Sequence, residues 1–417
     1  MSVARLKTVC VVGAGPAGLV AAKTLLQHGE YLVTVFEAAS CVGGMWRAQP
    51  GEFGDKCGPE MKTNLSRFTV AFPDLSWSSV DLSDPVSGSP VATPPMFPKA
   101  WQVGRYLEAY TKKFGLDSSI LLNQRVVAVR LLNDLNTWKV TTEDTVTKQR
   151  VTNTFAHLII ASGFFDKPAR SLDPSPEKHS PNIKHSSSFR DLSSLTKSAG
   201  KIVVIGGSIS GSEAAAQAAF QISDARSSPN KTKPVHADSK IYHIVNRPFY
   251  CLPRYLPQDP HNAEIQDFNL SPKFLPLDLV LYNLSRRGEG DISASITTVP
   301  PEKAQKGHEF LRSVLGGDQR DVGHPELVYT PDNTQYPAYT GITDTYLEFV
   351  RSGIIVPVQG WVDEVKQQED REAFDITLKQ YEPWYHAPWK EAKVHSQSPT
   401  LPRIMLTSFR VAPRSTM

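Results

Sequence analysis

Cysteine is scarce in this chain, and its scarcity narrows the class of protein. The 417 residues contain four cysteines, at positions 10, 41, 57 and 251. No two of them have the close spacing of a zinc site or a redox dithiol. Sparse, unpaired cysteines favour a reducing compartment, so we expect a cytoplasmic protein without structural disulfides and without a metal site.

Long apolar runs and a strong charge imbalance are also missing. No apolar stretch reaches the roughly 20 residues that span a bilayer, and no signal peptide is visible, so we expect no transmembrane segment. Lys and Arg total 45 against 42 Asp and Glu, and the net charge of +3 favours neither nucleic acid nor an anionic membrane as a partner. The length and the 40% hydrophobic content predict a globular protein of two or three domains.

Glycine, in contrast, is concentrated in an early turn. Residues 8–12 form a short apolar run typical of a buried strand, and Gly13-Ala14-Gly15-Pro16-Ala17-Gly18 follows at once. A helical pattern then ends at Gly29, and the β-branched run of residues 32–36 ends on Glu37. Strand, G-x-G-x-x-G turn, helix, strand and acid in this order predict a Rossmann-like dinucleotide-binding unit.

Each glycine of this turn has an expected role. Gly13 makes the tight turn, Gly15 lets backbone N–H groups approach a pyrophosphate, and Gly18 lets helix and strand pack closely. The helix N-terminus offers unpaired N–H donors to the phosphates. Glu37 is placed to accept hydrogen bonds from a ribose. Because a carboxylate there repels a 2′-phosphate, the turn predicts FAD or NAD rather than NADP.

A second glycine turn favours FAD over NAD. Residues 41–46 read Cys-Val-Gly-Gly-Met-Trp and follow the acid closely. Such a loop suits close passage beside the adenosine side of a flavin cofactor. The predicted FAD-binding residues of these two turns and the acid are Gly13, Gly15, Pro16, Ala17, Gly18, Glu37, Gly44, Met45 and Trp46.

A second unit of the same kind follows further along the chain. Residues 201–205 predict a buried strand, Gly206-Gly207-Ser208-Ile209-Ser210-Gly211 a turn, and residues 212–222 an alanine-rich helix. The strand of residues 240–245 leads to Arg247, which we place where the first unit has its acid. A guanidinium there favours the 2′-phosphate of NADP. The predicted NADPH-binding residues are Gly206, Ser208, Ser210, Gly211 and Arg247.

The rest of the chain gives weaker signals. The proline- and serine-rich stretch 168–181 is interpreted as a hinge, and residues 251–337 as irregular apart from a helical segment near 275–284. Beyond residue 379 we find no periodic pattern. Periodicity predicts helices over residues 103–114 and 344–350, and strands over 125–131, 137–142, 157–161, 354–358 and 374–378.

Together these features resemble the flavin-containing monooxygenases. Between the two units, residues 185–190 match the second half of the family fingerprint, and the aromatic ending favours heteroatom oxygenation over the Baeyer–Villiger relatives. The first half lacks the expected Phe and Gly, which are replaced by His179 and Pro181. The other matching segments are the two glycine turns near the N-terminus, the Asn64 segment, Ala161-Ser162-Gly163 with Pro168, residues 206–213, Asn246-Arg247-Pro248 and Leu252-Pro253-Arg254.

The resemblance implies a fold and an activity. The fold would be α/β with two Rossmann-like dinucleotide-binding domains, the NADPH domain of residues 167–330 being inserted into an FAD domain of residues 1–166 and 331–417. The activity would be that of a monooxygenase, in which NADPH reduces FAD and the reduced flavin traps O₂ as a C4a-hydroperoxide. One oxygen atom would then pass to the nitrogen or sulfur of a small molecule, in natural-product biosynthesis. Asn64 would serve at the flavin edge, where its amide hydrogen-bonds the oxygenated adduct. We expect O₂ and a small-molecule substrate as partners, and a homodimer as the assembly.

The resemblance ends near residue 365, and the family's alanine-threonine-glycine turn is missing after Leu378. This predicts a truncated or variant end, a wetter flavin ring, weak FAD retention and release of peroxide. Two alternatives stay open. One is a non-catalytic or uncoupled, NADPH-oxidising relative. The other is a pyridine-nucleotide disulfide oxidoreductase, which needs two cysteines about four residues apart, whereas Cys41 and Cys57 are 16 apart.

Overall fold

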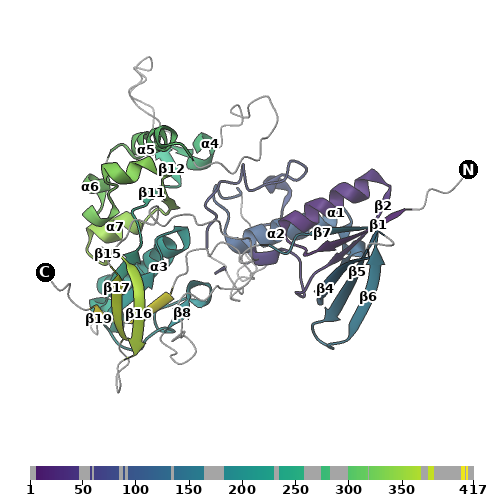
Figure 1. The fold of residues 1–417 in the computed structure, drawn as a ribbon, viewed down its shortest axis with the longest axis horizontal. Coiled ribbons are helices and arrows are strands. Elements are labelled where there is room, and N and C mark those ends of the chain that lie inside the picture. The colour runs from purple at the N-terminus through teal and green to yellow at the C-terminus, as the bar shows by residue number, and fades with distance from the viewer. Residues whose placement is uncertain are drawn as a thin grey trace, which may run out of the picture. The chain divides into compact units, whose positions relative to one another are not determined.

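The chain forms two compact units, Met1–Asp166 and Lys167–Met417 (Figure 1). Each unit has its own hydrophobic core, built on a sheet that contains at least three parallel strands. The computed structural model describes residues 6–46, 57–58, 61–83, 88–89, 93–132, 136–163, 183–229, 234–257, 274–281, 299–317, 319–367, 374–379, 405–408 and 410–411.

The first unit is built on a four-stranded parallel sheet with the strand order β3-β2-β1-β7. Its strands are β1 (Lys7–Val12), β2 (Tyr31–Phe36), β3 (Ile120–Leu121) and β7 (His157–Ile160). Three of these strands are short β-branched runs, which suit a sheet that is covered on both faces. The register pairs β1 with β2 from Lys7↔Tyr31 to Val12↔Phe36.

Two helices cover one face of this sheet. The helices α1 (Pro16–His28) and α2 (Ala100–Lys113) share a core with the alternate β1 residues Val9 and Val11. Helix α1 ends at Gly29, which takes the left-handed conformation with φ of 74°. The expected stop of the first helix is therefore confirmed, and its cause is a residue without a Cβ at the C-cap.

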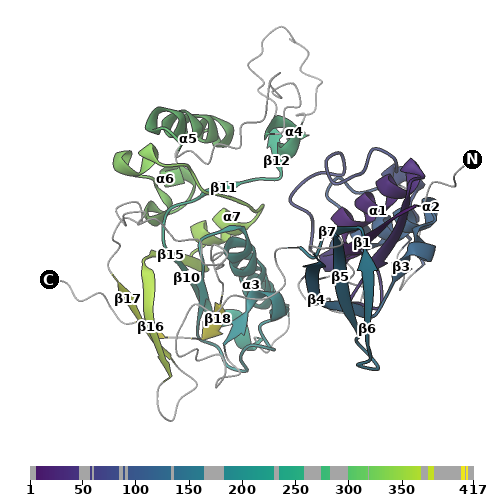
Figure 2. The same ribbon diagram turned by 45° about the vertical axis from the view of Figure 1, so that its right-hand side comes forward.

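An antiparallel sheet covers the other face. It consists of β4 (Gln124–Leu132), β5 (Thr137–Asp144) and β6 (Arg150–Phe155), as Figure 2 shows. Strand β6 was not predicted, because its alternating polar residues are exposed and give no apolar period. The core between the two sheets consists of Cys10, Phe36, Val140 and Phe155.

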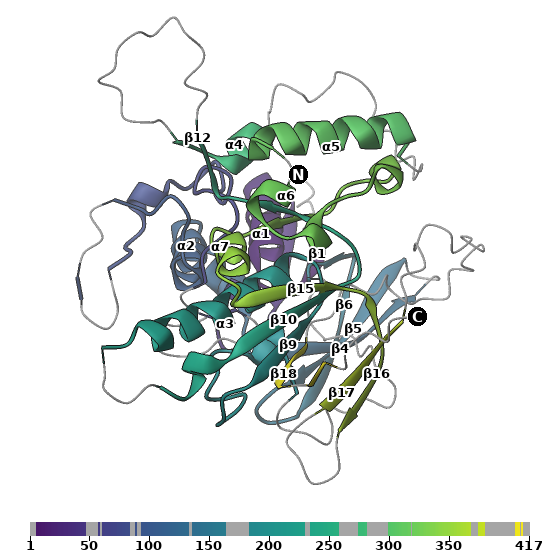
Figure 3. The same ribbon diagram turned by 90° about the vertical axis from the view of Figure 1, so that its left-hand side faces the viewer.

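The second unit repeats this plan on a five-stranded sheet with the order β15-β10-β9-β18-β8. Strands β9 (Lys201–Ile205), β10 (Lys240–Val245) and β15 (Ile355–Gln359) are parallel. Helices α3 (Ile209–Ser227) and α7 (Tyr346–Arg351) share a buried core with one face of the sheet (Figure 3). The remaining strands are β8 (Lys184–His185) and the antiparallel β18 (Met405–Ser408).

A three-stranded sheet packs on the other face of this five-stranded sheet. It consists of β16 (Trp361–Gln367), β17 (Phe374–Lys379) and β19 (Arg410–Val411), and β17 pairs with β16 in antiparallel and with β19 in parallel orientation. Phe374 and Ile376 of β17 share a buried core with Val203 of β9, Ile244 of β10 and Ile183, which directly precedes β8.

The element order explains why strand β15 belongs to the second unit. In the first unit, α2 precedes β3, which pairs with β2 and leads into the hairpin β4–β5. In the second unit, α7 precedes β15, which pairs with β10 and leads into the hairpin β16–β17. The sequence analysis expected residues 331–417 to return to the first unit. Instead β15 adds to β10, in parallel register from Ile241↔Ile355 to Val245↔Gln359.

A helical layer connects β10 to β15. Helix α5 (Pro301–Leu315) was missed in the sequence, where residues 251–337 were interpreted as irregular. The helix begins with Pro at its first turn and ends at Gly316 with φ of 78°, two signals that mark helix ends. The other elements are β11 (Tyr250–Leu252), β12 (Tyr255–Pro257), β13 (Phe274–Pro276), α4 (Leu277–Leu281), α6 (Gln319–Val322) and β14 (Thr340–Ile342).

Short 3₁₀ turns join several of these elements. The 3₁₀ turns are Gly44–Trp46, Trp77–Ser79, Leu116–Ser119, Ser186–Ser188, Val235–Asp238, Pro325–Leu327 and Pro331–Gln335.

No helix among the described residues is both long and apolar enough to span a bilayer.

Candidate functional site: two glycine turns

The first glycine turn brings α1 unusually close to β1. Gly13 has φ of +102°, a conformation that L side chains rarely adopt. A Cβ at Gly18 would lie 1.8 Å from the carbonyl oxygen of Gly13, so only glycine fits there. A Cβ at Gly13 would lie 2.7 Å from the carbonyl oxygen of Ala161, at the end of β7. These two glycines are therefore required by the fold itself.

Gly15 is different, because the protein alone does not require it. Its φ of −77° and ψ of −175° are open to any residue. A Cβ there would make ordinary contact, 3.6 Å from the Cα of Gly44. The missing side chain leaves bare backbone at the start of α1, next to the second glycine turn. This is the cradle that a pyrophosphate in close contact with backbone N–H groups would fill.

The second glycine turn docks directly on the first. The backbone N–H of Gly43 donates to the carbonyl of Ala14 over 3.0 Å, and Gly43 and Gly44 both have positive φ. Trp46 packs against the core of the first unit, whereas Met45 is 38% exposed. Both predicted turns are thus joined in one surface, with Met45 at its accessible edge.

The carboxylate of Glu37 stabilises the first glycine turn by accepting backbone hydrogen bonds. One carboxylate oxygen accepts the N–H of Ala14 and the other the N–H of Ala39, each over 2.8 Å. The side chain is 7% exposed, so the charge is buried and satisfied by backbone donors. A carboxylate has about four lone-pair positions, so two stay available for ribose hydroxyls. The predicted acid therefore also has a structural role that the spacing did not reveal.

The N-terminus of α1 is suited to an anion. Its N-cap, Gly15, has no side chain to cap the helix, and the first turn contains no acidic residue. Pro16 at the first position lacks an N–H, so the donors begin with Ala17 and Gly18. The partial positive charge of the helix end adds to these donors.

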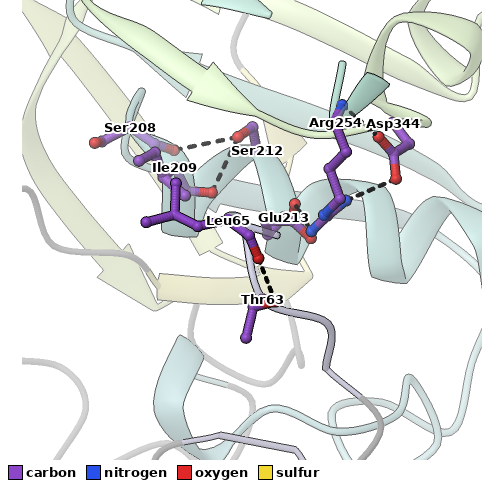
Figure 4. Close-up of polar contacts among 8 residues, drawn as sticks. All are labelled: Thr63, Leu65, Ser208, Ile209, Ser212, Glu213, Arg254 and Asp344. Carbon is purple, nitrogen blue, oxygen red and sulfur yellow. Dashed lines mark hydrogen bonds and ion pairs between the residues drawn. The ribbon is translucent and has the colours of Figure 1, made fainter. Parts of the chain in front are cut away.

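Asn64 lies in a loop that is fixed on both sides. The N–H of Thr63 donates to the carbonyl of Pro98 over 2.9 Å, and the hydroxyl of Thr63 donates to the carbonyl of Leu65 over 2.7 Å (Figure 4). Ser66 is fully buried, and its carbonyl accepts the N–H of Val70. Asn64 itself is half-buried. The loop thus presents the amide from an ordered support.

The glycine turn of the second unit, residues 206–211, has the same geometry as the turn of residues 13–18 in the first unit. Gly206 has φ of +127°, and a Cβ at Gly211 would lie 1.7 Å from the carbonyl oxygen of Gly206. Ser208 takes the N-cap of α3 in an extended conformation, without a capping hydrogen bond from its side chain. Ser210 lies in the first turn of that helix. The match is therefore structurally sound although Ser208 replaces the middle glycine.

The register corrects the position assigned to Arg247. The N–H of Gly13 donates to the carbonyl of Phe36, and the N–H of Gly206 donates to that of Ile244. The residue that corresponds to Glu37 is therefore Val245. Arg247 lies two residues further on, outside the strand. From the sequence, Arg247 was placed where the first unit has Glu37, whereas the backbone hydrogen bonds place Val245 there.

His243 supports the second turn from the strand below it. This fully buried side chain places Nε2 2.7 Å from the carbonyl oxygen of Gly206 and Nδ1 2.6 Å from the hydroxyl of Tyr346. Because a carbonyl only accepts, Nε2 carries the proton and Nδ1 accepts from the tyrosine. Burial lowers the pKa of His243 to about 4, so the ring is neutral at pH 7. Sequence reasoning missed this residue, since an isolated histidine in a strand gives no signal.

Arg254 forms a second buried polar group beside α3 (Figure 4). Its backbone N–H and its guanidinium both bind Asp344, over 2.9 Å and 2.8 Å, and the guanidinium also lies 3.3 Å from Glu213. Burial raises the pKa of Glu213, and the charge of Arg254 opposes this rise. The arginine ties the segment after β11 to the segment after β14, so it fixes the backbone near the turn.

All four cysteines lie among the described residues and form no disulfide there; Cys41 is half-buried and the other three are buried. Burial raises the pKa of Cys10 to about 12, as expected for an inert core thiol. Within the ranges that the structure describes, no three His, Cys, Asp or Glu side chains gather as a metal ion would require.

Comparison with known proteins agrees with this geometry. Residues 7–245, more than half of the chain, match the family described as pyridine nucleotide-disulphide oxidoreductase. Senecionine N-oxygenase from Tyria jacobaeae is 28% identical over 245 residues, which cover 58% of this chain and 49% of that protein. Probable flavin-containing monooxygenase 1 from Arabidopsis thaliana is 32% identical over 126 residues, which cover 30% of this chain and 20% of that protein. The chain thus matches about half, or less, of the length of these relatives.

A solved structure supports the fold. The crystal structure of OTEMO in complex with FAD and NADP (form 4) matches with a TM-score of 0.50 and 16% sequence identity, covering 86% of this chain and 67% of that chain. At this identity the likeness concerns the fold alone. It agrees with the α/β class that the sequence predicts.

Gly18→Ala and Gly15→Ala should separate the two kinds of glycine. Gly18→Ala should destabilise the flavin-free protein by at least about 3 kcal/mol, because the methyl group overlaps the Gly13 carbonyl. Gly15→Ala should change the unfolding free energy by less than about 1 kcal/mol, because its backbone suits alanine. Urea denaturation measures both. Equal losses of stability would contradict the assignment.

Stability should depend on pH through His243. Because its folded pKa, about 4, is below the unfolded value near 6.5, its contribution is complete above pH 6.5 and is lost as the pH falls towards 4. The full contribution is about 3 kcal/mol. His243→Asn should remove this part of the pH dependence. Urea denaturation at several pH values compares the two proteins, and parallel curves would show that His243 does not titrate on unfolding.

Proposed function

The chain belongs to the pyridine nucleotide-disulphide oxidoreductase family, and on this premise we propose that it acts as an FAD- and NADPH-dependent monooxygenase. The first unit would bind FAD and the second NADPH. The reaction would add one oxygen atom of O₂ to the nitrogen or sulfur of a small molecule, in the biosynthesis of a natural product. The names of the relatives, an N-oxygenase and flavin-containing monooxygenases, support this class.

The observation that carries the proposal is the bare backbone at Gly15. Neither its dihedral angles nor its neighbours in the protein require glycine. The residue is explained once a pyrophosphate lies against the N-terminus of α1. Gly44, in the turn of residues 41–46, lies next to Gly15, and Glu37 would offer its remaining lone pairs to a ribose. These residues fit FAD, which would therefore be held by the turn, the acid and the segment 44–46.

The second unit fits a nucleotide with a 2′-phosphate. Its turn has the same backbone, and α3 likewise has no acidic residue in its first turn. Val245 replaces the acid, so no carboxylate stands at the position that Glu37 occupies in the first unit. Arg247 follows two residues later and supplies a positive charge. Gly206, Ser208, Ser210 and Gly211 would hold the pyrophosphate of NADPH.

The residues of this chain would bind and orient rather than react. When bound, the flavin supplies the redox and oxygen-transfer chemistry. Asn64 would offer its amide as a donor and an acceptor without gaining or losing a proton, since an amide does not titrate. His243 holds the Gly206 carbonyl, and Arg254 holds the segments beside α3, so both keep the NADPH turn in one shape.

Disulfide reduction, which the family name mentions, is the second candidate. The cysteine closest in sequence to Cys41 is 16 residues away, which is far from the spacing of a redox dithiol. We therefore propose oxygenation in preference to disulfide reduction.

One experiment separates these candidates. The full chain, supplied with FAD and NADPH, is given O₂ with a tertiary amine, a thioether or a small disulfide. The proposal predicts NADPH consumption with formation of an N-oxide or sulfoxide. Peroxide in place of product would identify an uncoupled oxidase, thiol formation would identify a reductase, and no NADPH consumption would identify a binding protein.

Gly15→Ala should lose flavin without losing its fold. The added methyl group occupies the space that the pyrophosphate needs, so FAD retained after purification should fall at least about tenfold. Absorbance near 450 nm, the flavin band, measures the retained cofactor. The matched control is Gly29→Asn, at the other end of α1, which should keep its flavin because a Cβ at Gly29 would meet nothing within 4 Å. Full flavin content in Gly15→Ala would reject the FAD site.

Arg247→Ala should weaken NADPH selectively. Hydrogen bonds between a guanidinium and a phosphate contribute about 1.5–3 kcal/mol, so the KM for NADPH should rise about 10- to 100-fold. The KM for NADH should stay within about twofold, because NADH lacks the 2′-phosphate. Steady-state kinetics with both nucleotides measures the two values. An equal rise for both would show that Arg247 is structural.

A further inference from the structure

Arg247 does not extend freely from the end of β10. Its guanidinium lies over the ring of Tyr339, a half-buried residue that directly precedes β14. The positive charge thus faces the negative face of an aromatic ring, in a cation–π contact. The two residues are 92 positions apart in the sequence, and no sequence motif connects them.

The backbone of Tyr339 is fixed from both sides. Its N–H donates to the hydroxyl of Tyr329 over 2.9 Å, and its carbonyl accepts the N–H of Tyr250 over 2.8 Å. The pairing of β11 with β14 begins at the next residue, with Tyr250↔Thr340. The backbone that carries the ring under Arg247 is therefore positioned by the sheet and by a second tyrosine.

Further aromatic contacts hold this support in place. The rings of Tyr250 and Tyr329 stack with their centroids 5.0 Å apart. The buried His308 contacts both rings, and its Nε2 lies 2.8 Å from the carbonyl oxygen of Tyr336. Because that carbonyl only accepts, Nε2 carries the proton and Nδ1 accepts the hydroxyl of Tyr250 over 3.0 Å. Burial also lowers the pKa of His308, which keeps the ring neutral.

We propose that Tyr339 is a positioning residue which directs the guanidinium of Arg247 and thereby sets the preference for a 2′-phosphate. This inference rests on the proposed NADPH site and names the residue that makes its selectivity. A flexible arginine loses rotamer entropy when it binds a phosphate, whereas one already held against a ring loses less. A ring contacts the face of a guanidinium, whereas hydrogen bonds to phosphate oxygens would come from the N–H groups in its plane, so one arginine can make both contacts.

Two nucleotide fragments test the inference without the reaction. Adenosine 2′,5′-bisphosphate carries the 2′-phosphate and AMP does not, and both bind without flavin chemistry. Isothermal titration calorimetry measures their affinities for the full chain supplied with FAD. Tyr339→Leu should weaken the bisphosphate about fivefold, as expected for the loss of a half-buried cation–π contact, and leave AMP within about twofold. Tyr339→Phe keeps the ring and should resemble the original protein.

A double-mutant cycle shows whether Tyr339 acts through Arg247. In an Arg247→Ala background, Tyr339→Leu should have no further effect on the bisphosphate. An equal loss for both fragments in Tyr339→Leu, or a full effect in the Arg247→Ala background, would overturn the inference. No loss in Tyr339→Leu would also overturn it.

Two further results keep the outcomes distinct. If Arg247→Ala leaves bisphosphate binding unchanged, the proposed role of Arg247 fails, and the inference fails with it. If Arg247→Ala weakens the bisphosphate and Tyr339→Leu does not, only the inference fails. Should Tyr339→Leu not fold, Tyr329→Phe removes the hydroxyl that accepts the Tyr339 N–H while keeping every ring. This variant should weaken the bisphosphate about two- to threefold, and unchanged binding would reject the inference.

Discussion

The contact between a helix and the carbonyl oxygen of the turn before it determines the form of both units. In α1 and in α3, a Cβ on the third glycine of the turn would lie less than 2 Å from the first glycine's oxygen. This closeness places each helix directly over the end of its preceding strand. The helix N-terminus then opens at the carboxyl edge of the parallel sheet, where α/β proteins bind ligands.

The two turns obey the same constraint but are braced in opposite ways. In the first unit, Glu37 accepts the N–H of Ala14, so a negative charge supports the turn from the donor side. In the second unit, His243 donates to the carbonyl of Gly206, so a neutral ring supports the turn from the acceptor side. Both arrangements fix the backbone. The first brace carries a negative charge, and the second does not.

The sequence predicted the parts of the fold that have strong local patterns. The strands around both turns and the stop at Gly29 follow from apolar runs and from a residue free to take positive φ. Helix α5 was missed although Pro301 and Gly316 mark its ends, because its surface is mostly polar. Strand β15 was recognised as a strand but assigned to the wrong unit. Its partner depends on long-range pairing with β10, which local pattern does not encode.

The candidate site shows the same limit. Glycine spacing predicted both nucleotide-binding turns, and Glu37 was predicted because it is the acidic residue directly after the strand pattern of residues 32–36. The register at Val245, the brace at His243 and the ring of Tyr339 depend on contacts between residues about 40 to 90 positions apart in the sequence. Such contacts arise only when the sheet is assembled.

The difference at one strand end then has a chemical consequence. Glu37 in the first unit corresponds to Val245 in the second. At this position the second unit therefore lacks the buried charge and the two hydrogen-bond acceptors that Glu37 supplies in the first. Val245 packs against Gly207: a Cβ added to Gly207 would lie only 3.0 Å from the Cβ of Val245. The space next to the turn is therefore filled by an apolar contact. Without the carboxylate, a phosphate near this strand end meets no fixed repulsion at that position. Arg247, which lies against Tyr339, follows Val245 by two residues. The ends of β2 and β10 therefore differ in charge, while the turns that precede their helices share one backbone geometry.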